Sequence, residues 1–174
     1  MVSDKIQIIS LGLADWKKGY DIAIKSCSIL KKRQFAFEYI IIGAKKSEEI
    51  LFLRNDLDLN REIRLIDELP EQQLTNYIKE SHIFLQTDIS GSTYNKVLEA
   101  MCLNTFVIAT NTLVNSKLIT NKKEGFLIPL LNAKKMAQQI MYYNNLNDQE
   151  INQIKKRAFE KAEKTLSVNS ENIF

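Results

Sequence analysis

The stretch IQIISLGLADWKKGYDIAIKSCSILKK, residues 6–32, decides the fold class of this 174-residue chain. Its first six residues form an apolar run of strand length, and residues 18–32 carry apolar side chains at helical spacing. Runs of the same kind recur between helical segments, at residues 37–42, 63–66, 83–86, 106–109 and 126–128. Because these runs are rich in Ile, Leu and Val with little polar alternation, we expect helices to cover both faces of the strands. The sequence therefore predicts an α/β fold with a doubly wound, six-stranded parallel sheet.

The chain divides into a main domain and a charged C-terminal extension. Residues 1–147 carry all six expected strands, and no low-complexity linker or internal repeat interrupts them. Residues 148–174 follow as a helix from Gln149 to about Leu166 and a polar tail from Ser167. We expect this helix to pack on something outside the six-stranded core.

Composition excludes several classes of protein. The net charge of +3 comes from 24 basic and 21 acidic residues spread along the chain, which gives no reason to expect a nucleic acid partner. No apolar run approaches the roughly 20 residues of a transmembrane helix, so we expect no transmembrane segment. Cys27 and Cys102 lack metal or redox spacing and are expected to be buried thiols of a cytoplasmic protein. The single histidine, His82, excludes a multi-histidine metal site within this chain.

The first candidate ligand-binding segment follows the first expected strand. In open α/β sheets, ligands bind beyond the carboxyl ends of the strands. Gly12 and Gly19 permit a tight turn there, and Lys18 stands at the expected opening of the next helix, where it could hold a phosphate. The alternative is an ordinary loop with its lysines in solvent, because neither a G-x-G-x-x-G nor a P-loop spacing is present.

The second candidate segment follows the fourth expected strand. Ser92 or Thr93 can cap a helix over residues 94–103, which would leave first-turn N–H groups facing the same crevice as Lys18. Glu99, further along this helix, can accept two hydrogen bonds from vicinal sugar hydroxyls. The alternative for Glu99 is an exposed or paired carboxylate.

Residues 95–110, NKVLEAMCLNTFVIAT, resemble the N-x-x-L-E-A-M-A-x-G-x-P-V-I-A-T motif of the retaining glycosyltransferases of family four. Asn104 stands in place of the motif's glycine and Phe106 in place of its proline. Lys18 and Gly19 are similar to the end of the family's G-R-L-x-x-x-K-G loop, with Gly12 at its start. The resemblance covers roughly residues 6–146 and implies one half of a GT-B fold with a Rossmann-like, nucleotide-sugar-binding sheet.

The resemblance also implies roles for individual residues. The family's glutamate at the position of Glu99 binds ribose, and its lysine at the position of Lys18 binds the diphosphate. Backbone amides at the second segment add to the phosphate site, and the loop after the third strand meets the base. The residues that correspond to the phosphate-binding amides are Ser92, Thr93, Tyr94 and Asn95. Those that correspond to the base-binding loop are Ile66, Asp67 and Leu69.

Two departures from the family pattern concern charged groups. The family's first glutamate, eight positions before the second, is Gly91 here, and the arginine of the first loop is Leu13. Each loss removes charge-assisted hydrogen bonds of about 1.5 to 3 kcal/mol. Two explanations stay open: a rewired donor site that uses Asp88, Ser90 or Lys17, or a non-catalytic GT-B-like binding or regulatory module with a degenerate site.

The resemblance implies a donor-binding domain that serves transfer of a sugar from a nucleoside-diphosphate sugar to a glycan or lipid-linked acceptor. It implies no cofactor and no metal. The acceptor site and the catalytic groups are expected on an N-terminal domain, in cis or in trans, and we expect little or no transfer by these residues alone. A peripheral position at the inner face of the membrane stays open for the full-length protein. A phosphoacceptor receiver, a further doubly wound alternative, is disfavoured because no acidic cluster follows the first strand.

Overall fold

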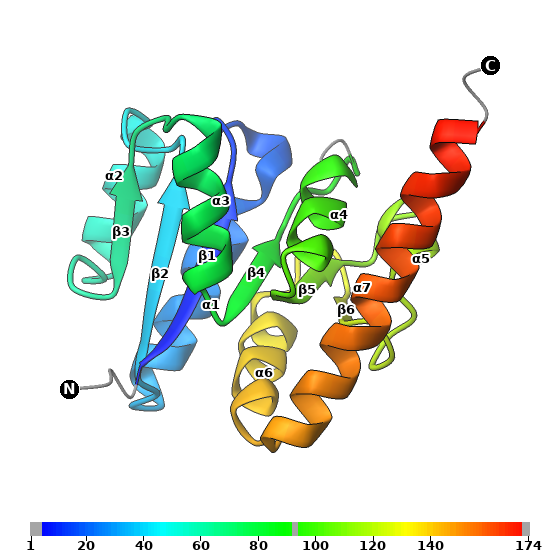
Figure 1. The fold of residues 1–174 in the computed structure, drawn as a ribbon. Helices are drawn as coiled ribbons and strands as arrows, with labels where there is room; N and C mark the ends of the chain where they lie inside the picture. The colour runs from blue at the N-terminus through cyan, green and yellow to red at the C-terminus, as the bar shows by residue number, and fades with distance from the viewer. Residues whose placement is uncertain (1–4, 92–93, 172–174) are drawn as a thin grey trace.

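The computed structural model describes residues 5–91 and 94–171 and shows an open sheet with helices on both faces (Figure 1). Every strand pairing is parallel, and the order across the sheet is β3-β2-β1-β4-β5-β6. The strands are β1 (Ile6–Leu11), β2 (Phe37–Ile42), β3 (Ile63–Ile66), β4 (Ile83–Gln86), β5 (Phe106–Thr110) and β6 (Phe126–Ile128). The predicted doubly wound, six-stranded parallel sheet is confirmed.

Helices connect successive strands as in other doubly wound sheets. The connecting helices are α1 (Tyr20–Lys32), α2 (Glu48–Asp56), α3 (Glu71–Glu80), α4 (Tyr94–Cys102) and α5 (Asn115–Leu118), and two further helices, α6 (Ala133–Asn144) and α7 (Asp148–Glu171), follow β6. Asn104 ends the α4 region with φ of 58°, the left-handed conformation that favours Gly and Asn after a helix. Its N–H donates to the Met101 carbonyl at 3.1 Å, and the Thr105 N–H donates to the Ala100 carbonyl at 3.0 Å, which together form a Schellman motif.

Alternate residues of each strand enter two separate cores, one on each face of the sheet. Ile8 packs with α1, α2 and α6, whereas Ile9 packs with α3, α4, α5 and α7. The central strand therefore has no solvent-facing side, as its continuous apolar sequence predicted. Two buried hydroxyls between the strands are paired, because the Tyr39 hydroxyl donates to Ser10 Oγ at 2.8 Å and Ser10 Oγ donates to the Leu85 carbonyl at 2.5 Å.

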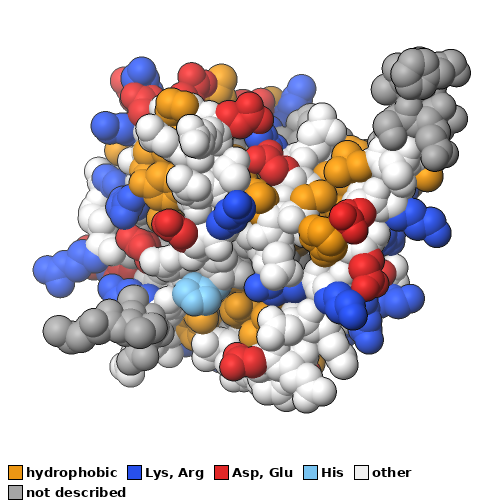
Figure 2. Space-filling view, viewed as in Figure 1, with side chains coloured by type: hydrophobic (Ala, Val, Ile, Leu, Met, Phe, Trp, Pro, Cys, Tyr) orange, Lys and Arg blue, Asp and Glu red, His pale blue; other side chains and the backbone are white. Residues whose placement is uncertain are grey.

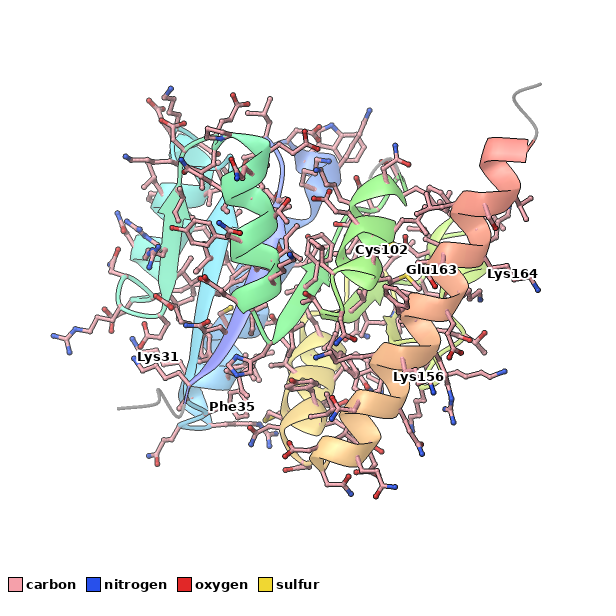
Figure 3. All side chains as sticks on the ribbon, viewed as in Figure 1. Lys31, Phe35, Cys102, Lys156, Glu163 and Lys164 are labelled. Carbon is pink, nitrogen blue, oxygen red and sulfur yellow. The ribbon has the colours of Figure 1, made fainter. Side chains whose placement is uncertain are left out.

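The C-terminal helix α7 packs against the main sheet domain. Ala158 and Ala162 are buried among residues of α4 and β5, which corrects the expectation of packing outside the six-stranded core. The backbone is helical to Glu171, beyond the expected end near Leu166. Figure 3 shows Cys102 on α4 close to α7, and burial together with the Glu163 charge raises the pKa of its thiol. Cys102 is half-buried rather than fully buried.

The surface is of mixed charge. Figure 2 shows acidic and basic side chains interspersed over the face formed by α3, α4 and α7. None of the helices within residues 5–91 and 94–171 combines the length and apolar character needed to cross a bilayer.

Candidate functional site

Two glycines bring the carboxyl ends of β1 and β2 into close contact. The Gly12 N–H donates to the Ile42 carbonyl at 2.9 Å, which extends the pairing of the two strands by one residue. Gly43 follows with φ of 99°, and a Cβ atom there would lie 2.7 Å from the Gly12 carbonyl oxygen. Because the loop after β1 lies directly on the backbone after β2, no side chain fits at Gly43.

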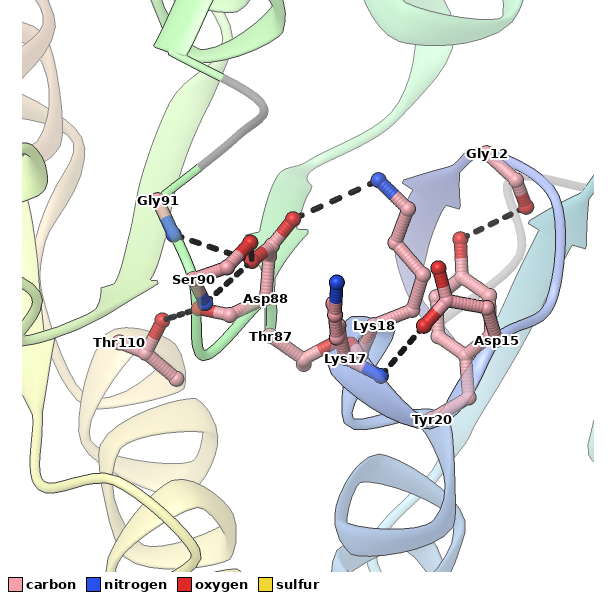
Figure 4. A network of polar contacts seen from close by, with 10 residues as sticks. All are labelled: Gly12, Asp15, Lys17, Lys18, Tyr20, Thr87, Asp88, Ser90, Gly91 and Thr110. Atoms are coloured by element: carbon pink, nitrogen blue, oxygen red, sulfur yellow. Dashed lines mark hydrogen bonds and ion pairs between the residues drawn. The ribbon is translucent and has the colours of Figure 1, made fainter.

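The turn after β1 positions Lys18. Residues Trp16–Lys18 form a 3₁₀ turn that begins with the Asp15 carboxylate accepting the Lys17 N–H at 2.6 Å (Figure 4). Gly19 ends the turn with φ of 65°, and a Cβ on it would lie 2.5 Å from the Thr87 carbonyl oxygen. Lys18 therefore precedes α1, which begins at Tyr20, and this corrects the expectation that Lys18 opens the helix.

A buried carboxylate holds Lys18 against the loop after β4. Lys18 Nζ lies 3.4 Å from Oδ2 of Asp88, whose side chain is completely buried (Figure 4). Oδ1 of Asp88 accepts the Ser90 N–H and hydroxyl at 2.6 Å each and the Gly91 N–H at 3.0 Å. The Thr110 hydroxyl donates to the Asp88 carbonyl at 2.6 Å. This network fixes the loop after β4 and provides the buried charge with an opposite charge and several donors.

A cavity of about 300 Å³ opens beside Lys18 at the carboxyl edge of the sheet. Five aliphatic side chains form most of its wall, and one carboxylate and two ammonium groups reach it. The lining residues are Leu11, Gly12, Leu13, Lys18, Ile42, Gly43, Glu68, Leu69, Leu74 and Lys96. An apolar pocket with a few converging charges is the usual form of a small-molecule site.

Some of the residues predicted to bind the phosphate or the base line this cavity, and others do not. Gly12, Lys18 and Leu69 line it together. Ile66 belongs to β3 and packs against the α3–α4 core, and Asp67 lies 3.4 Å from the Lys46 ammonium, so neither is part of the wall. The loop after β3 reaches the cavity through Glu68 and Leu69 instead.

The second predicted segment is partly described. Ser92 and Thr93 lie outside the described residues. Tyr94 and Asn95 form the start of α4, where the first N–H groups of a helix have no partner within the helix. Their roles as phosphate-binding residues remain predictions.

Glu99 is ion-paired and does not line the cavity. Its Oε2 lies 2.7 Å from Nζ of Lys96, three residues earlier on α4. Lys96, which the sequence did not single out, is part of the cavity wall. Gly91, at the position of the family's first glutamate, has φ of 74°, and a Cβ there would lie 2.9 Å from Cγ2 of Val114. At this position the chain therefore lacks the family's glutamate and also has a backbone conformation that disfavours any side chain.

His82 and Trp16 do not line the cavity. The His82 ring accepts the Gln7 N–H at Nδ1, 3.0 Å away, at the amino end of β4. Trp16 is 73% exposed, and the Lys17 ammonium lies 5.7 Å from the centre of its ring. Within residues 5–91 and 94–171, no group of three or more His, Cys, Asp or Glu side chains is arranged to hold a metal ion.

The parallel sheet, with a cavity at its carboxyl edge, places this chain in the class of open α/β domains, in which ligands usually bind beyond the carboxyl ends of the strands. Residues 2–163 match the family Glycosyl transferases group 1, and the chain belongs to this family. That part of the predicted resemblance is confirmed.

Two glycosyltransferases related to this chain are longer than it is. It is 27% identical over 165 residues to WcaL of Escherichia coli (strain K12), named as a colanic acid biosynthesis glycosyltransferase, covering 91% of this chain and 41% of WcaL. It is 28% identical over 139 residues to the amylovoran biosynthesis glycosyltransferase AmsK of Erwinia amylovora, covering 76% of this chain and 34% of AmsK. The chain therefore spans less than half the length of these relatives.

Solved glycosyltransferase structures share the fold. The C-terminal domain of the group 1 glycosyl transferase LpcC from Francisella tularensis superposes with a TM-score of 0.80 and 17% identity, covering 92% of this chain and 86% of that one. Alr3699/HepE of Anabaena, solved with UDP-glucose, gives a TM-score of 0.81 and 13% identity, covering 97% of this chain and 47% of HepE. The chain thus has the fold of a C-terminal GT-B domain.

Proposed function

We propose that this chain is the donor-binding domain of a retaining, family-four glycosyltransferase, which moves a sugar from a nucleoside-diphosphate sugar to a glycan or lipid-linked acceptor. The observation that carries the proposal is the cavity of about 300 Å³ with Lys18 at its edge and α4 beginning beside it. Family membership and the UDP-glucose complex of HepE, a protein of the same fold, support it.

The two kinds of cavity wall suit the two ends of a nucleotide. The apolar part, which includes Leu69 and Leu74, offers an apolar surface for a base, and Lys18 offers a charge for the diphosphate. Lysine and helix N–H groups stabilise negative charge that develops on a leaving diphosphate. We therefore propose a reaction without a metal or other cofactor, in which these groups neutralise the leaving diphosphate.

A second domain is proposed to cover the carboxyl edge. Large apolar side chains are exposed in loops after three strands: Leu13 and Trp16 after β1, Leu113 after β5, and Leu130 and Leu131 after β6. Such a group of exposed hydrophobic residues is typical of an interface. We propose that it contacts the N-terminal, acceptor-binding domain, in cis or in trans, and that this chain alone transfers little or no sugar. The free thiols favour a cytoplasmic location.

A specific observation also favours a second function, a non-catalytic binding or regulatory module. Gly91 stands at the position of the family's first glutamate and supplies no carboxylate. The carboxylate of Glu99 is ion-paired with Lys96. A domain with this site would hold a nucleotide without directing its sugar. Transfer activity of the full-length protein with a bound donor would separate the two functions.

Calorimetric titration with UDP, GDP and ADP and their sugar conjugates tests the donor site. Because Lys18→Met alone would remove the cation that faces the buried Asp88 carboxylate, the variant is Lys18→Met combined with Asp88→Asn. We expect one nucleotide series to bind and this double variant to weaken it at least tenfold. Lys25→Met is the matched control, since Lys25 lies on α1, outside the cavity wall, and its replacement should leave binding unchanged. Absence of binding up to millimolar ligand would overturn the proposal for this domain.

A further inference from the structure

Two lysines from different elements reach the same cavity. Lys18 comes from the turn after β1 and Lys96 from the first turn of α4, and both belong to the cavity wall. Each is held by one carboxylate: Asp88 lies 3.4 Å from Lys18, and Glu99 lies 2.7 Å from Lys96. The two pairs differ in burial, because Asp88 is fully buried whereas the side chains of Lys96 and Glu99 are 34% and 24% exposed.

We propose that Lys96 is a second ligand-binding cation of this site, which binds the diphosphate together with Lys18 and has Glu99 as its counter-ion when no ligand is present. The proposal rests on the proposed function for the position of the ligand. It also accounts for the missing arginine of the first loop, because Leu13 at that position supplies no charge.

The local energetics of α4 oppose a purely helix-stabilising role for Lys96. A cation in the first turn faces the positive end of the helix dipole, which disfavours it. An i,i+3 ion pair stabilises a helix best with the acidic residue first, and here Lys96 precedes Glu99. A partly exposed pair of this kind contributes little to the stability of a helix. The position of Lys96 is therefore better explained by the cavity than by the helix.

The partial exposure of the Lys96–Glu99 pair allows an exchange of partners. The lysine stem has four rotatable bonds, so its ammonium can move from a carboxylate to a phosphate oxygen without movement of the backbone. No covalent bond forms or breaks in this exchange, because an ion pair with Glu99 is replaced by one with a phosphate oxygen. Glu99 is released at the same time and becomes available to accept hydrogen bonds from ligand hydroxyls.

Inorganic pyrophosphate is the probe, because it carries the diphosphate charge without a base or a sugar. Titration of the 174-residue chain by calorimetry should show binding that Lys96→Met weakens at least tenfold and that Lys96→Arg largely retains. Lys25→Met is the matched control, since Lys25 forms an i,i+4 pair with Asp21 at 3.1 Å on α1, away from the cavity. Equal pyrophosphate affinity of Lys96→Met and Lys25→Met would overturn the proposal, and so would no pyrophosphate binding at all.

Glu99→Gln tests the counter-ion. Removing its charge frees Lys96, so pyrophosphate should bind as tightly as to the wild type or several-fold more tightly, and weaker binding would contradict the exchange. The two proposals fail in different ways. If pyrophosphate binding depends on Lys96 but no nucleotide binds, only the donor-site function is contradicted. If a nucleotide binds but pyrophosphate affinity does not depend on Lys96, only the role of Lys96 is contradicted.

Discussion

The ammonium of Lys18 lies 3.4 Å from the fully buried carboxylate of Asp88, 70 positions further along the chain. Removing one partner of a buried ion pair costs about 3 to 5 kcal/mol, and hydrogen bonds to the remaining charge, here from Ser90 and Gly91, reduce this cost. We expect Lys18→Met to lower the free energy of unfolding by about 3 kcal/mol, the lower end of this range, because the Lys18 side chain is 16% exposed. Urea denaturation measures this loss.

The double variant Lys18→Met with Asp88→Asn supplies the control for that measurement. An asparagine oxygen can still accept the Ser90 and Gly91 N–H groups, and no buried charge remains. The double variant should therefore be more stable than Lys18→Met alone. Additive losses in the double-mutant cycle would show that the two groups do not interact.

Gly91 should resist replacement by the family's glutamate. Its φ of 74° is strained for any side chain, and Cγ2 of Val114 lies 2.9 Å from a Cβ placed there. We expect Gly91→Ala and Gly91→Glu both to lower stability by about 1 to 3 kcal/mol, because backbone strain is common to both. Thermal unfolding measures the loss. Val114→Ala should recover part of it in combination with Gly91→Ala, and wild-type stability of Gly91→Ala would contradict the strain.

Asn104 should tolerate glycine and resist alanine. Its φ of 58° lies in the left-handed region, where an ordinary side chain costs about 1 to 2 kcal/mol. Asn104 is exposed, so replacement removes little packing. We expect Asn104→Ala to lower the free energy of unfolding by about 1 kcal/mol, whereas Asn104→Gly should match or exceed the wild type in the same denaturation experiment. The reverse order of the two variants would be incompatible with this backbone conformation.

His82 should make stability depend on pH in mildly acidic solution. Desolvation, together with the charge of Lys155, lowers the pKa of His82 in the folded protein. The unfolded chain therefore binds the proton first, so this contribution to stability is fully present above about pH 6.5 and is lost as pH falls toward the lowered pKa. Melting temperatures between pH 5 and 7.5 measure the loss. His82→Asn keeps an acceptor for the Gln7 N–H and should flatten the pH dependence; an unchanged profile would assign it to another group.

The strands could be predicted because each is a continuous apolar run. All six begin where the sequence indicates, since burial on both faces leaves little room for polar residues inside a strand. Helix ends were less accurate. Gly19, with φ of 65°, delays α1 to Tyr20, and α7 continues past Leu166 because neither Gly nor Pro interrupts residues 167–171.

The site could be predicted only in part. Gly12, Lys18 and Leu69 lie at one cavity because parallel strands end at the same edge, a consequence of the fold class alone. The Lys18–Asp88 contact depends on β1 and β4 being neighbours in the sheet. The alternation of strands and helices along the sequence does not reveal which strands are neighbours. The Lys96–Glu99 spacing was visible, and a lysine in the first turn of a helix was the signal that would have singled out Lys96.

The pairing of β1 with β4 has a consequence for how the domain folds. It joins two sets of strands that otherwise pair with their neighbours in sequence, and the Ser10–Leu85 hydrogen bond across it closes a loop of 75 positions. Contacts between distant residues form slowly, because the chain must lose entropy before they are made. We expect this central pairing to limit the refolding rate, so that Ile83→Val, at the β1–β4 register, slows refolding more than Ile63→Val on β3. Until that junction forms, Lys18 and Asp88 belong to separate halves of the chain, so we expect the cavity beside Lys18 to be among the last parts of the protein to assemble.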